Sequence, residues 1–461
     1  MERREFLHST GLLAAATVGL LPAESKESKA QNASASSQTN AAAAPSDRWS
    51  ERKPKGEPHV RRWNEQRWIL DNIIQANGID WDQGHTGGLL RSCGLVISGD
   101  IAGIKQRAKR FAAIGTAFEV VARKREAEAE KAAASGDTIS ARDNYYIAAQ
   151  FYGQAMWTIY EVNDHLHALN QKKRDTFGNY MKLADHRIEW VEIPYRGAHL
   201  PAVFHLPPDY KPGTKVPVIV AVPGMDGFKE KYVSLYGDAI LSRGFGILSV
   251  EGPGYWEAPL RGLFIDVAGW QEASHEVMKW LRARPEVDSD KLGMTGSSYG
   301  SFFSAVMLAA ESNYKFCIVH GTCYEPGGDT IFNTASVTFK KRFMFMSGIT
   351  DEHEFDEFAK TLDWHGLAEK VTTPYLVVAG SADQLCPTRF TEAFLDALAG
   401  PKQLLLYQDA DHGVGGSTAV TAGPNQEEFI RDWMKNRLDG KPLDNERWFV
   451  DVYGKVTKTP I

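Results

Sequence analysis

The chain is poor in cysteine and has no excess of basic residues, and each shortage argues against a class of protein. Its 461 residues include four cysteines, which lack metal-ligand spacing and indicate buried thiols rather than a disulfide scaffold. The 52 basic and 58 acidic residues leave a net charge of −6, which disfavours a nucleic-acid partner and an anionic membrane surface. This composition favours a small-molecule substrate as the partner.

Signatures of bound cofactors are missing as well. No G-x-G-x-x-G follows an expected strand, and no histidine cluster has ligand spacing. We therefore expect no metal and no organic cofactor. The uncharged segment at residues 9–22 is too short to cross a bilayer, and no cysteine follows it, so no membrane anchor is expected.

The N-terminus predicts export. Arg3 and Arg4 precede an apolar segment, which resembles a twin-arginine signal, and Ser28-Lys29-Ala30 fits a small-residue cleavage site. Residues 1–30 are therefore interpreted as a signal peptide, and the mature protein is expected to be periplasmic or secreted. The alternative is an untargeted cytosolic protein with a basic, apolar tail.

Composition and periodicity divide the next part of the chain. Residues 31–58 consist mainly of small and polar residues that cannot build a core, and they predict a disordered linker. Residues 59–185 carry apolar residues at helical spacing and predict a helical cap domain. Aromatic residues from Tyr145 to Tyr160 are expected to form the contact face of this cap over the active site. No second copy of the helix pair recurs, so a solenoid is not expected.

From residue 186 to residue 440 the pattern is that of alternating strands and helices. A hairpin at 188–206 opens the region. Further strands are expected at 216–222, 246–250, 292–295, 316–319, 375–379 and 403–407, and helices at 232–243, 271–284, 301–311, 388–398 and 427–438. This alternation predicts an α/β fold, a mostly parallel sheet with helices on both faces. Residues 325–358 interrupt it as part of a lid, and residues 441–461 are assigned to a C-terminal extension.

One turn in this region has the pattern of a catalytic nucleophile. Gly296-Ser297-Ser298-Tyr299-Gly300 lies between an expected strand and a buried helix, the G-x-S-x-G context of a nucleophile elbow in the α/β-hydrolase fold. The turn would expose the Ser298 hydroxyl, and the helix N-terminus would face developing negative charge. The alternative is a plain Gly/Ser turn.

The partners of Ser298 are expected after later strands, in the order acid and then histidine. Asp383 and His412 each follow an expected strand, where catalytic loops of this fold lie. His412 would accept the Ser298 proton, and Asp383 would orient the imidazole. Asp409 and Asp411 compete for the acid role but are disfavoured because they lie so close to His412 in sequence.

An oxyanion hole requires two backbone N–H donors. Tyr299, directly after the nucleophile, predicts one donor, and Met225 in the loop 223–227 predicts the other. Asp226 and Lys229 are expected to form an ion pair that shapes this loop.

Several motifs together resemble a known group of α/β-hydrolases. They are residues 224–230, 252–257 and 284–288, the elbow, and Asp411-His412-Gly413. The group includes 2,6-dihydroxypseudooxynicotine hydrolase, the fungal polyketide-shortening hydrolases and esterase-like proteins, and the similarity runs from about residue 63 to residue 438. The resemblance implies a serine hydrolase with a Ser-Asp-His triad that cleaves a ketone C–C bond or a carboxylic ester through an acyl-enzyme. The elbow departs from many relatives, which have a second glycine at the position of Ser301, and the substrate is left open.

The resemblance also implies a role for Glu257, because the carbon–carbon hydrolase carries an acidic residue at this position near its substrate. With a raised pKa in a low-dielectric cleft, Glu257 would act as a general acid. A purely structural acid is the alternative.

Two other functions stay open. A prolyl-oligopeptidase-like exopeptidase would usually carry a propeller before its catalytic domain, whereas this N-terminal region is helical. A catalytically inert binding scaffold would be expected to lose a triad member, whereas all three are present. A homodimer is a possible assembly.

Overall fold

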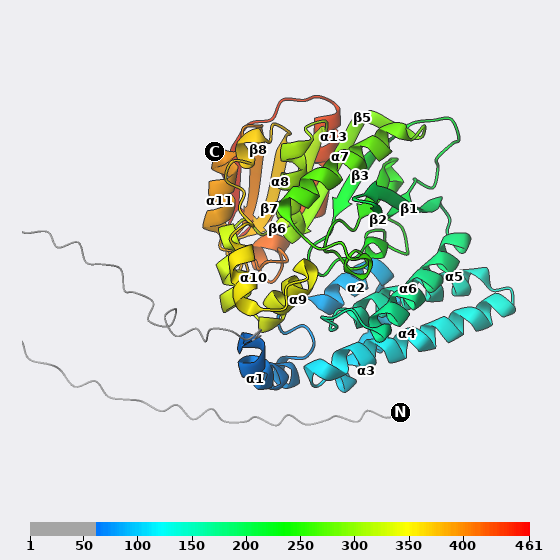
Figure 1. The fold of residues 1–461 in the computed structure, drawn as a ribbon. Coiled ribbons are helices and arrows are strands. Elements are labelled where there is room, and N and C mark those ends of the chain that lie inside the picture. Colours follow the sequence, from blue (N-terminus) through cyan, green and yellow to red (C-terminus); the bar gives the residue numbers. More distant parts are fainter. Residues whose placement is uncertain (1–60) are drawn as a thin grey trace, which may run out of the picture. The chain divides into compact units, whose positions relative to one another are not determined.

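The computed structural model describes residues 61–461, so the predicted signal peptide (1–30) and linker (31–58) lie outside the described residues. Helices come first in this part of the chain, and a large sheet with flanking helices follows (Figure 1). The last of the first helices ends at Leu183, and the first strand begins at Ile188.

The N-terminal part consists of six α-helices. They are α1 (Arg61–Asn77), α2 (His85–Cys93), α3 (Ser98–Arg107), α4 (Phe111–Ala134), α5 (Thr138–Met156) and α6 (Asp164–Leu183). Asp137 starts α5 by accepting the Ser140 N–H, and Asn163 starts α6 by accepting the Leu166 N–H. α5 packs between α4 and α6. Figure 1 shows these helices gathered at one end of the sheet.

The ten strands form one sheet in the order β1-β2-β4-β3-β5-β6-β7-β8-β9-β10. They are β1 (Ile188–Tyr195), β2 (Ala198–His205), β3 (Val216–Val222), β4 (Gly246–Val250), β5 (Val287–Ser298), β6 (Phe316–Thr322), β7 (Tyr375–Gly380), β8 (Lys402–Tyr407), β9 (Glu446–Val450) and β10 (Val456–Pro460). All pairs from β4 to β9 are parallel, whereas β1, β2 and β10 pair antiparallel. Strands such as β7 are buried along their whole length, because helices cover both faces.

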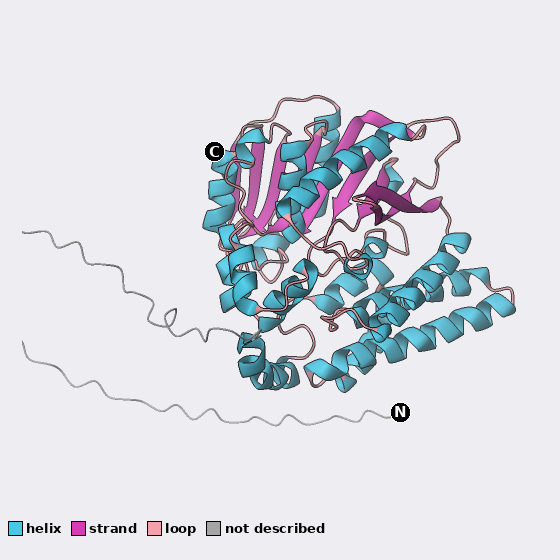
Figure 2. Ribbon diagram, in the orientation of Figure 1, coloured by secondary structure: helices cyan, strands magenta, loops and turns pink. Residues whose placement is uncertain are grey.

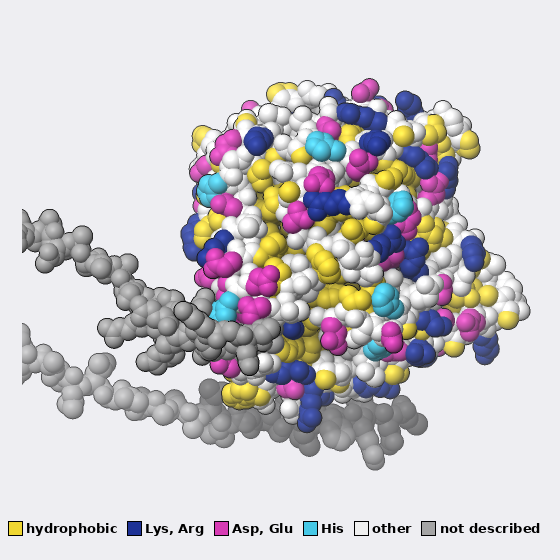
Figure 3. All heavy atoms as spheres, in the orientation of Figure 1, with side chains coloured by type: hydrophobic (Ala, Val, Ile, Leu, Met, Phe, Trp, Pro, Cys, Tyr) yellow, Lys and Arg dark blue, Asp and Glu magenta, His cyan; other side chains and the backbone are white. Residues whose placement is uncertain are grey.

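Helices lie in front of and behind the strands, as Figure 2 shows. They include α7 (Val267–Ala283), α8 (Tyr299–Ala310), α11 (Thr388–Ala397), α12 (Thr418–Ala422) and α13 (Gln426–Leu438). The prediction of an α/β fold with a mostly parallel sheet is confirmed. On the face drawn in Figure 3, basic and acidic side chains are interspersed.

Residues 325–358, which interrupt the alternation, form short helical turns followed by α9 (Val337–Ser347) and α10 (Glu352–Ala359). α9 packs against α1, so this insert contacts the N-terminal helices. Within residues 61–461 no helix has both the length and the apolar character needed to cross a membrane.

Two predicted features differ from the structure. Residues 232–243 form no α-helix but a loop that ends in a 3-10 turn (Leu241–Arg243). Gly237 has a φ of +102°, which breaks a right-handed helix, and the Leu235 N–H donates to Ser92 O of the N-terminal part. Residues 441–461, assigned to an extension, instead add β9 and β10 to the sheet.

Candidate active site

Ser298 is the last residue of β5, and Tyr299 is the first residue of α8. The Ser298 backbone has φ 52° and ψ −128°, a conformation that is rare for a residue with a side chain. Such strain costs on the order of 1–3 kcal/mol and persists only where the surroundings enforce it. The strand-to-helix turn therefore has the backbone of a nucleophile elbow.

The glycines of the elbow are required by close approach. A Cβ atom on Gly300 would lie 2.3 Å from Val222 O, and one on Gly296 would lie 2.4 Å from Gly300 O. A side chain at Gly300 would push the turn away from the end of β3, and one at Gly296 would collide with the first turn of α8. These clashes explain why the sequence has glycine on both sides of Ser298.

The structure brings Ser298, His412 and Asp383 together at the carboxyl ends of three parallel strands. His412 Nε2 lies 3.1 Å from Ser298 Oγ, and His412 Nδ1 lies 2.8 Å from Asp383 Oδ2. The other Asp383 oxygen accepts the N–H groups of Leu385 and Cys386 at 2.8 and 2.9 Å, which fixes the carboxylate. His412 therefore has the Asp383 carboxylate at Nδ1 and the Ser298 hydroxyl at Nε2.

The two competing acids have other partners. Asp411 accepts the Gly415 N–H at 2.9 Å within its own loop. Asp409 has a φ of 54° and donates its N–H to Ser381 Oγ at 2.9 Å. Among the three candidates, the described contacts of His412 are with Asp383 only.

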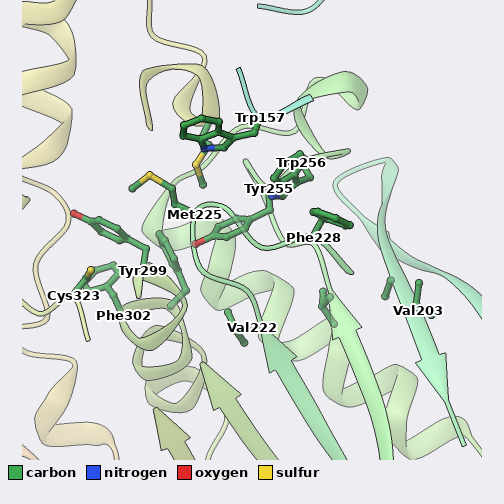
Figure 4. Packing of buried hydrophobic residues seen from close by; sticks show 14 of the residues in the cluster. Trp157, Val203, Val222, Met225, Phe228, Tyr255, Trp256, Tyr299, Phe302 and Cys323 are labelled. Atoms are coloured by element: carbon green, nitrogen blue, oxygen red, sulfur yellow. The ribbon is translucent and has the colours of Figure 1, made fainter. Parts of the chain in front are cut away.

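The loop that contains Met225 passes directly beside the elbow. A Cβ atom on Gly224 would lie 3.1 Å from Ser298 Cβ, so the backbone there is in contact with the serine. Tyr299, as the first residue of α8, has no intrahelical acceptor for its N–H. Figure 4 shows Met225, Tyr255 and Tyr299 as neighbours in the packed region above the sheet.

Two residues beside the nucleophile have roles that the sequence did not reveal. Ser301 Oγ donates to Ser298 O at 2.6 Å and accepts the Cys323 N–H at 3.1 Å, so it links the elbow to the end of β6. Cys323 Sγ lies 3.6 Å from Ser298 Oγ. Burial raises the pKa of the Cys323 thiol well above its usual range, so Cys323 is protonated and is not a competing nucleophile. Cys323 directly follows β6, and this position at the end of a strand was the feature of the sequence that could have pointed to it.

Glu257 lies among cations, which corrects the hypothesis that it donates a proton. Its carboxylate lies 2.6 Å from Lys229 Nζ, 2.7 Å from Arg174 Nη1 and 2.6 Å from Arg261 Nη2. Burial alone would raise the pKa of Glu257, but the charges of Lys229, Lys173 and Arg174 outweigh burial and hold this pKa well below its usual range. The carboxyl group is ionised at neutral pH and has no proton to give.

Asp226 and Lys229 do not form the ion pair that we expected. Lys229 contacts Glu257 and other buried acids, whereas Asp226 accepts the Trp157 indole N–H at 2.7 Å and a hydrogen bond from Gln83. Proximity in sequence suggested the pair, but partners from distant segments compete successfully for both charges. The N-terminal helices therefore hold the loop that contains Met225.

The aromatic segment of α5 lies against the same loop. Tyr146 donates its hydroxyl to Val233 O at 2.6 Å, and Gln150 Nε2 donates to Glu230 O at 2.9 Å. These contacts place the N-terminal helices over the loop after β3, next to Ser298.

A pocket of about 570 Å³ lies between α1 and the insert and is lined in part by Leu70, Trp81, Phe339 and Leu385. Because Leu385 lies two residues after Asp383, the pocket adjoins the loop that carries the acid. Within residues 61–461, no three or more His, Cys, Asp and Glu side chains are grouped so that they could hold a metal ion.

Two family models match parts of the chain. Residues 273–441 match the prolyl oligopeptidase family, and residues 196–320 match the X-Pro dipeptidyl-peptidase (S15) family. Each covers less than half of the chain, and the two overlap at the elbow.

Among curated proteins, the chain is similar to the α/β-hydrolase pydG of Acremonium sp, with 29% identity over 51% of this chain and 56% of the relative. It is 30% identical to the α/β-hydrolase xenA of Xenoacremonium sinensis over 41% of this chain and 46% of the relative. The matches span about half the length of these relatives.

Among solved structures, the 2,6-dihydroxy-pseudo-oxynicotine hydrolase superposes with a TM-score of 0.64 at 20% identity, over 77% of this chain and 97% of that one. AbyA5 superposes with a TM-score of 0.55 at 14% identity, over 77% and 92%. At such identities these structures establish the fold alone. The chain therefore has the fold of these structures and is similar in sequence to the named α/β-hydrolases.

Proposed function

We propose that the chain is a serine hydrolase that forms an acyl-enzyme with a small organic substrate and cleaves a carboxylic ester or a ketone C–C bond. The observation that carries this proposal is the pair of contacts made by His412, at 3.1 Å to Ser298 Oγ and 2.8 Å to Asp383 Oδ2. This is the arrangement in which histidine can move a proton from serine to a leaving group.

The steps follow from that arrangement. Ser298 Oγ attacks the substrate carbonyl carbon while His412 Nε2 takes the hydroxyl proton, and the carbonyl electron pair moves onto oxygen. The bond to the leaving group then breaks, and His412 returns the proton to the leaving atom. A water molecule deprotonated by His412 next attacks the acyl-enzyme, and its collapse releases a carboxylic acid and restores the Ser298 hydroxyl.

The backbone N–H groups of Met225 and Tyr299 are the proposed donors to the oxyanion. Support comes from the contact of Gly224 with Ser298 and from the place of Tyr299 at the start of α8. Each such donor is typically worth a hundredfold or more in turnover, about 3 kcal/mol.

The ionised state of Glu257 favours ester cleavage over C–C cleavage. An alkoxide or phenoxide leaving group needs only the proton on His412, whereas a carbanion equivalent benefits from a second acid. Because Glu257 carries no proton, this chain lacks the acid that we expected for C–C cleavage. We retain a ketone C–C bond as the second substrate class because the structural neighbour is a hydrolase of 2,6-dihydroxy-pseudo-oxynicotine.

An exopeptidase is a second candidate, favoured by the matches to two peptidase families. In the described residues, however, helices α1 to α6 precede the sheet where such a peptidase would usually carry a propeller. Hydrolysis of an X-Pro p-nitroanilide at rates comparable with p-nitrophenyl esters would favour the peptidase.

Labelling with a fluorophosphonate tests the nucleophile. We expect the label on Ser298, and we expect Ser298→Ala to lose labelling and at least about a thousandfold of ester turnover with a native circular dichroism spectrum. Ser242→Ala, at an exposed serine, is the control and should retain both. A panel of p-nitrophenyl esters and aryl β-diketones then separates the two bond types. Ester turnover by Ser298→Ala at the wild-type rate would disprove the assignment.

A further inference from the structure

Arg342 in α9 is a buried cation that forms no salt bridge within residues 61–461. Burial lowers its pKa, and the charges of Asp226 and Glu251 raise it. The Arg342 side chain is 2% exposed, and within residues 61–461 its Nε and Nη2 atoms have no hydrogen-bond partner. Lys340, on the same helix and also buried, differs in lying 3.3 Å from Glu352 and 2.6 Å from Asp356. Among the described residues, Lys340 therefore forms direct salt bridges with carboxylates, whereas Arg342 forms none.

Such an arrangement is costly. A buried charge without a paired and hydrogen-bonded partner loses several kcal/mol of hydration, and arginine does not escape this cost by losing its proton. The guanidinium lies 4.5 Å from the ring centroid of Trp256 and 5.3 Å from that of Phe345. Stacking on aromatic rings stabilises a cation but leaves its N–H groups unused.

Three other buried donors lie around the guanidinium. The hydroxyls of Tyr160 and Tyr255 and the indole N–H of Trp256 have no hydrogen-bond partner within the described part of the chain. Burial raises the pKa of both tyrosines, and the charges of Arg342 and Asp226 act on each in opposite directions. The segment after α5, the loop after β4 and α9 therefore bring four donor groups together.

This cluster adjoins the candidate nucleophile. Figure 4 shows the Tyr255 ring reaching toward Met225 and Tyr299. Burial raises the pKa of Tyr255 most, followed by Tyr232 and by Cys323, whose sulfur lies 3.6 Å from Ser298 Oγ. Trp256 has a φ of 37°, a strained conformation of the kind found at functional sites.

We propose that Arg342, together with Tyr160, Tyr255 and Trp256, binds a carboxylate of the substrate at a point remote from the bond that is cleaved. Four groups with unused donors match a carboxylate, which accepts up to about four hydrogen bonds and pairs with a guanidinium in two parallel contacts. Asp226 is the acid whose charge acts most strongly on Arg342, but its carboxylate already accepts from Trp157 and Gln83. The substrate class is then an ester or ketone whose acyl part carries a carboxylate. This inference rests on the proposed hydrolase function and narrows its substrate.

Two esters whose acyl chains have the same number of carbons test the proposal. Mono-4-nitrophenyl glutarate ends its acyl chain in a carboxylate, and 4-nitrophenyl pentanoate ends it in a methyl group. We expect wild type to favour the glutarate, and Arg342→Met to lower the ratio of the two kcat/KM values about a hundredfold, as loss of a buried charge partner does. Lys340→Met is the matched control, since Lys340 already has its own carboxylates, and should keep the ratio. Succinate and adipate monoesters would show the preferred chain length.

A binding arm separates failure of this inference from failure of the hydrolase proposal. If wild type hydrolyses neither these esters nor the aryl β-diketones, the hydrolase proposal fails, and calorimetry with monobenzyl glutarate and benzyl pentanoate on the Ser298→Ala protein still tests Arg342. Tighter binding of the glutarate, lost in Ser298→Ala/Arg342→Met, supports the carboxylate site. If Arg342→Met or Ser298→Ala/Arg342→Met keeps an unchanged preference for the glutarate, the proposed carboxylate site is overturned.

Discussion

Lys229 Nζ and Glu257 Oε2 form an ion pair of 2.6 Å between two buried side chains. Glu257 also contacts Arg174 of α6, and Lys229 also contacts Glu251 at the end of β4. The pair thereby joins the N-terminal helices to two loops at the carboxyl ends of the strands. Buried pairs contribute little over an apolar core, but removal of Glu257 takes the shortest contact from Lys229, which keeps only the longer contacts with Glu230 and Glu251.

Glu257→Gln is therefore expected to act on stability rather than on one reaction. The amide leaves Lys229 without its 2.6 Å partner and should lower the free energy of unfolding by about 3 kcal/mol, measured by urea denaturation. Turnover of esters and of aryl ketones should fall by similar factors. The control is Glu272→Gln, which removes a partly exposed partner of Arg196 and should cost less than about 1 kcal/mol. A loss confined to ketones would restore the general-acid hypothesis.

The same pair predicts a pH dependence. The pKa of Glu257 is lower in the folded protein than in the unfolded chain, so its contribution is complete above the unfolded pKa and is lost as pH falls toward the folded pKa. The difference in stability between wild type and Glu257→Gln should therefore be smaller at pH 3 than at pH 7. Thermal melts at the two pH values measure it, and an equal difference would show that folding does not lower the pKa of Glu257.

The sequence predicted the layers of the fold and the segments of the site because both depend on local patterns. Apolar runs alternate with amphipathic helices, and Ser298, Asp383 and His412 each directly follow such a run. The contacts of His412 join it to Ser298, 114 positions away, and to Asp383, 29 positions away, and the order of the motifs alone allowed us to expect them.

Features that depend on distant partners were not predictable. Glu257 is ionised because cations from α6 and from two loops surround it, and none of these is visible from its neighbours in sequence. In the sequence, Arg342 looks like any other charged residue of a helix. Its lack of a salt bridge can be recognised only in the packed interior. β9 was missed because a short strand after a helix has little periodicity.

The choice of the acid can be tested directly. Asp383→Asn should lower kcat for p-nitrophenyl esters by about a thousandfold or more, because the amide cannot stabilise the imidazolium of His412. Asp411→Asn keeps an oxygen acceptor for the Gly415 N–H and should change kcat by less than about threefold. Activity after each change, with native melting curves, distinguishes the two acids, and the reverse pattern would assign the role to Asp411.

The N-terminal arginines lead to a prediction for localisation, which we propose from the sequence. Replacement of Arg3 and Arg4 by lysine should leave the precursor in the cytoplasm, whereas wild type should appear outside it without about the first 30 residues. Fractionation followed by N-terminal sequencing measures both. Normal export of the double variant would rule out the twin-arginine route.

Trp157→Phe tests whether the N-terminal helices support catalysis through the loop after β3. The indole nitrogen of Trp157 lies 2.7 Å from Asp226, which is next to Met225. Its loss removes a hydrogen bond to a charged group, worth about 1.5–3 kcal/mol. The loop that carries Met225, a proposed oxyanion donor, is then less firmly held. We expect kcat for p-nitrophenyl esters to fall about tenfold with little change in KM. Trp448→Phe, which removes an indole N–H bonded to Glu446 in β9, is the matched control and should leave kcat unchanged. A fall in melting temperature at constant kcat would make the Trp157 contact purely structural, because a displaced oxyanion donor must slow the chemical step.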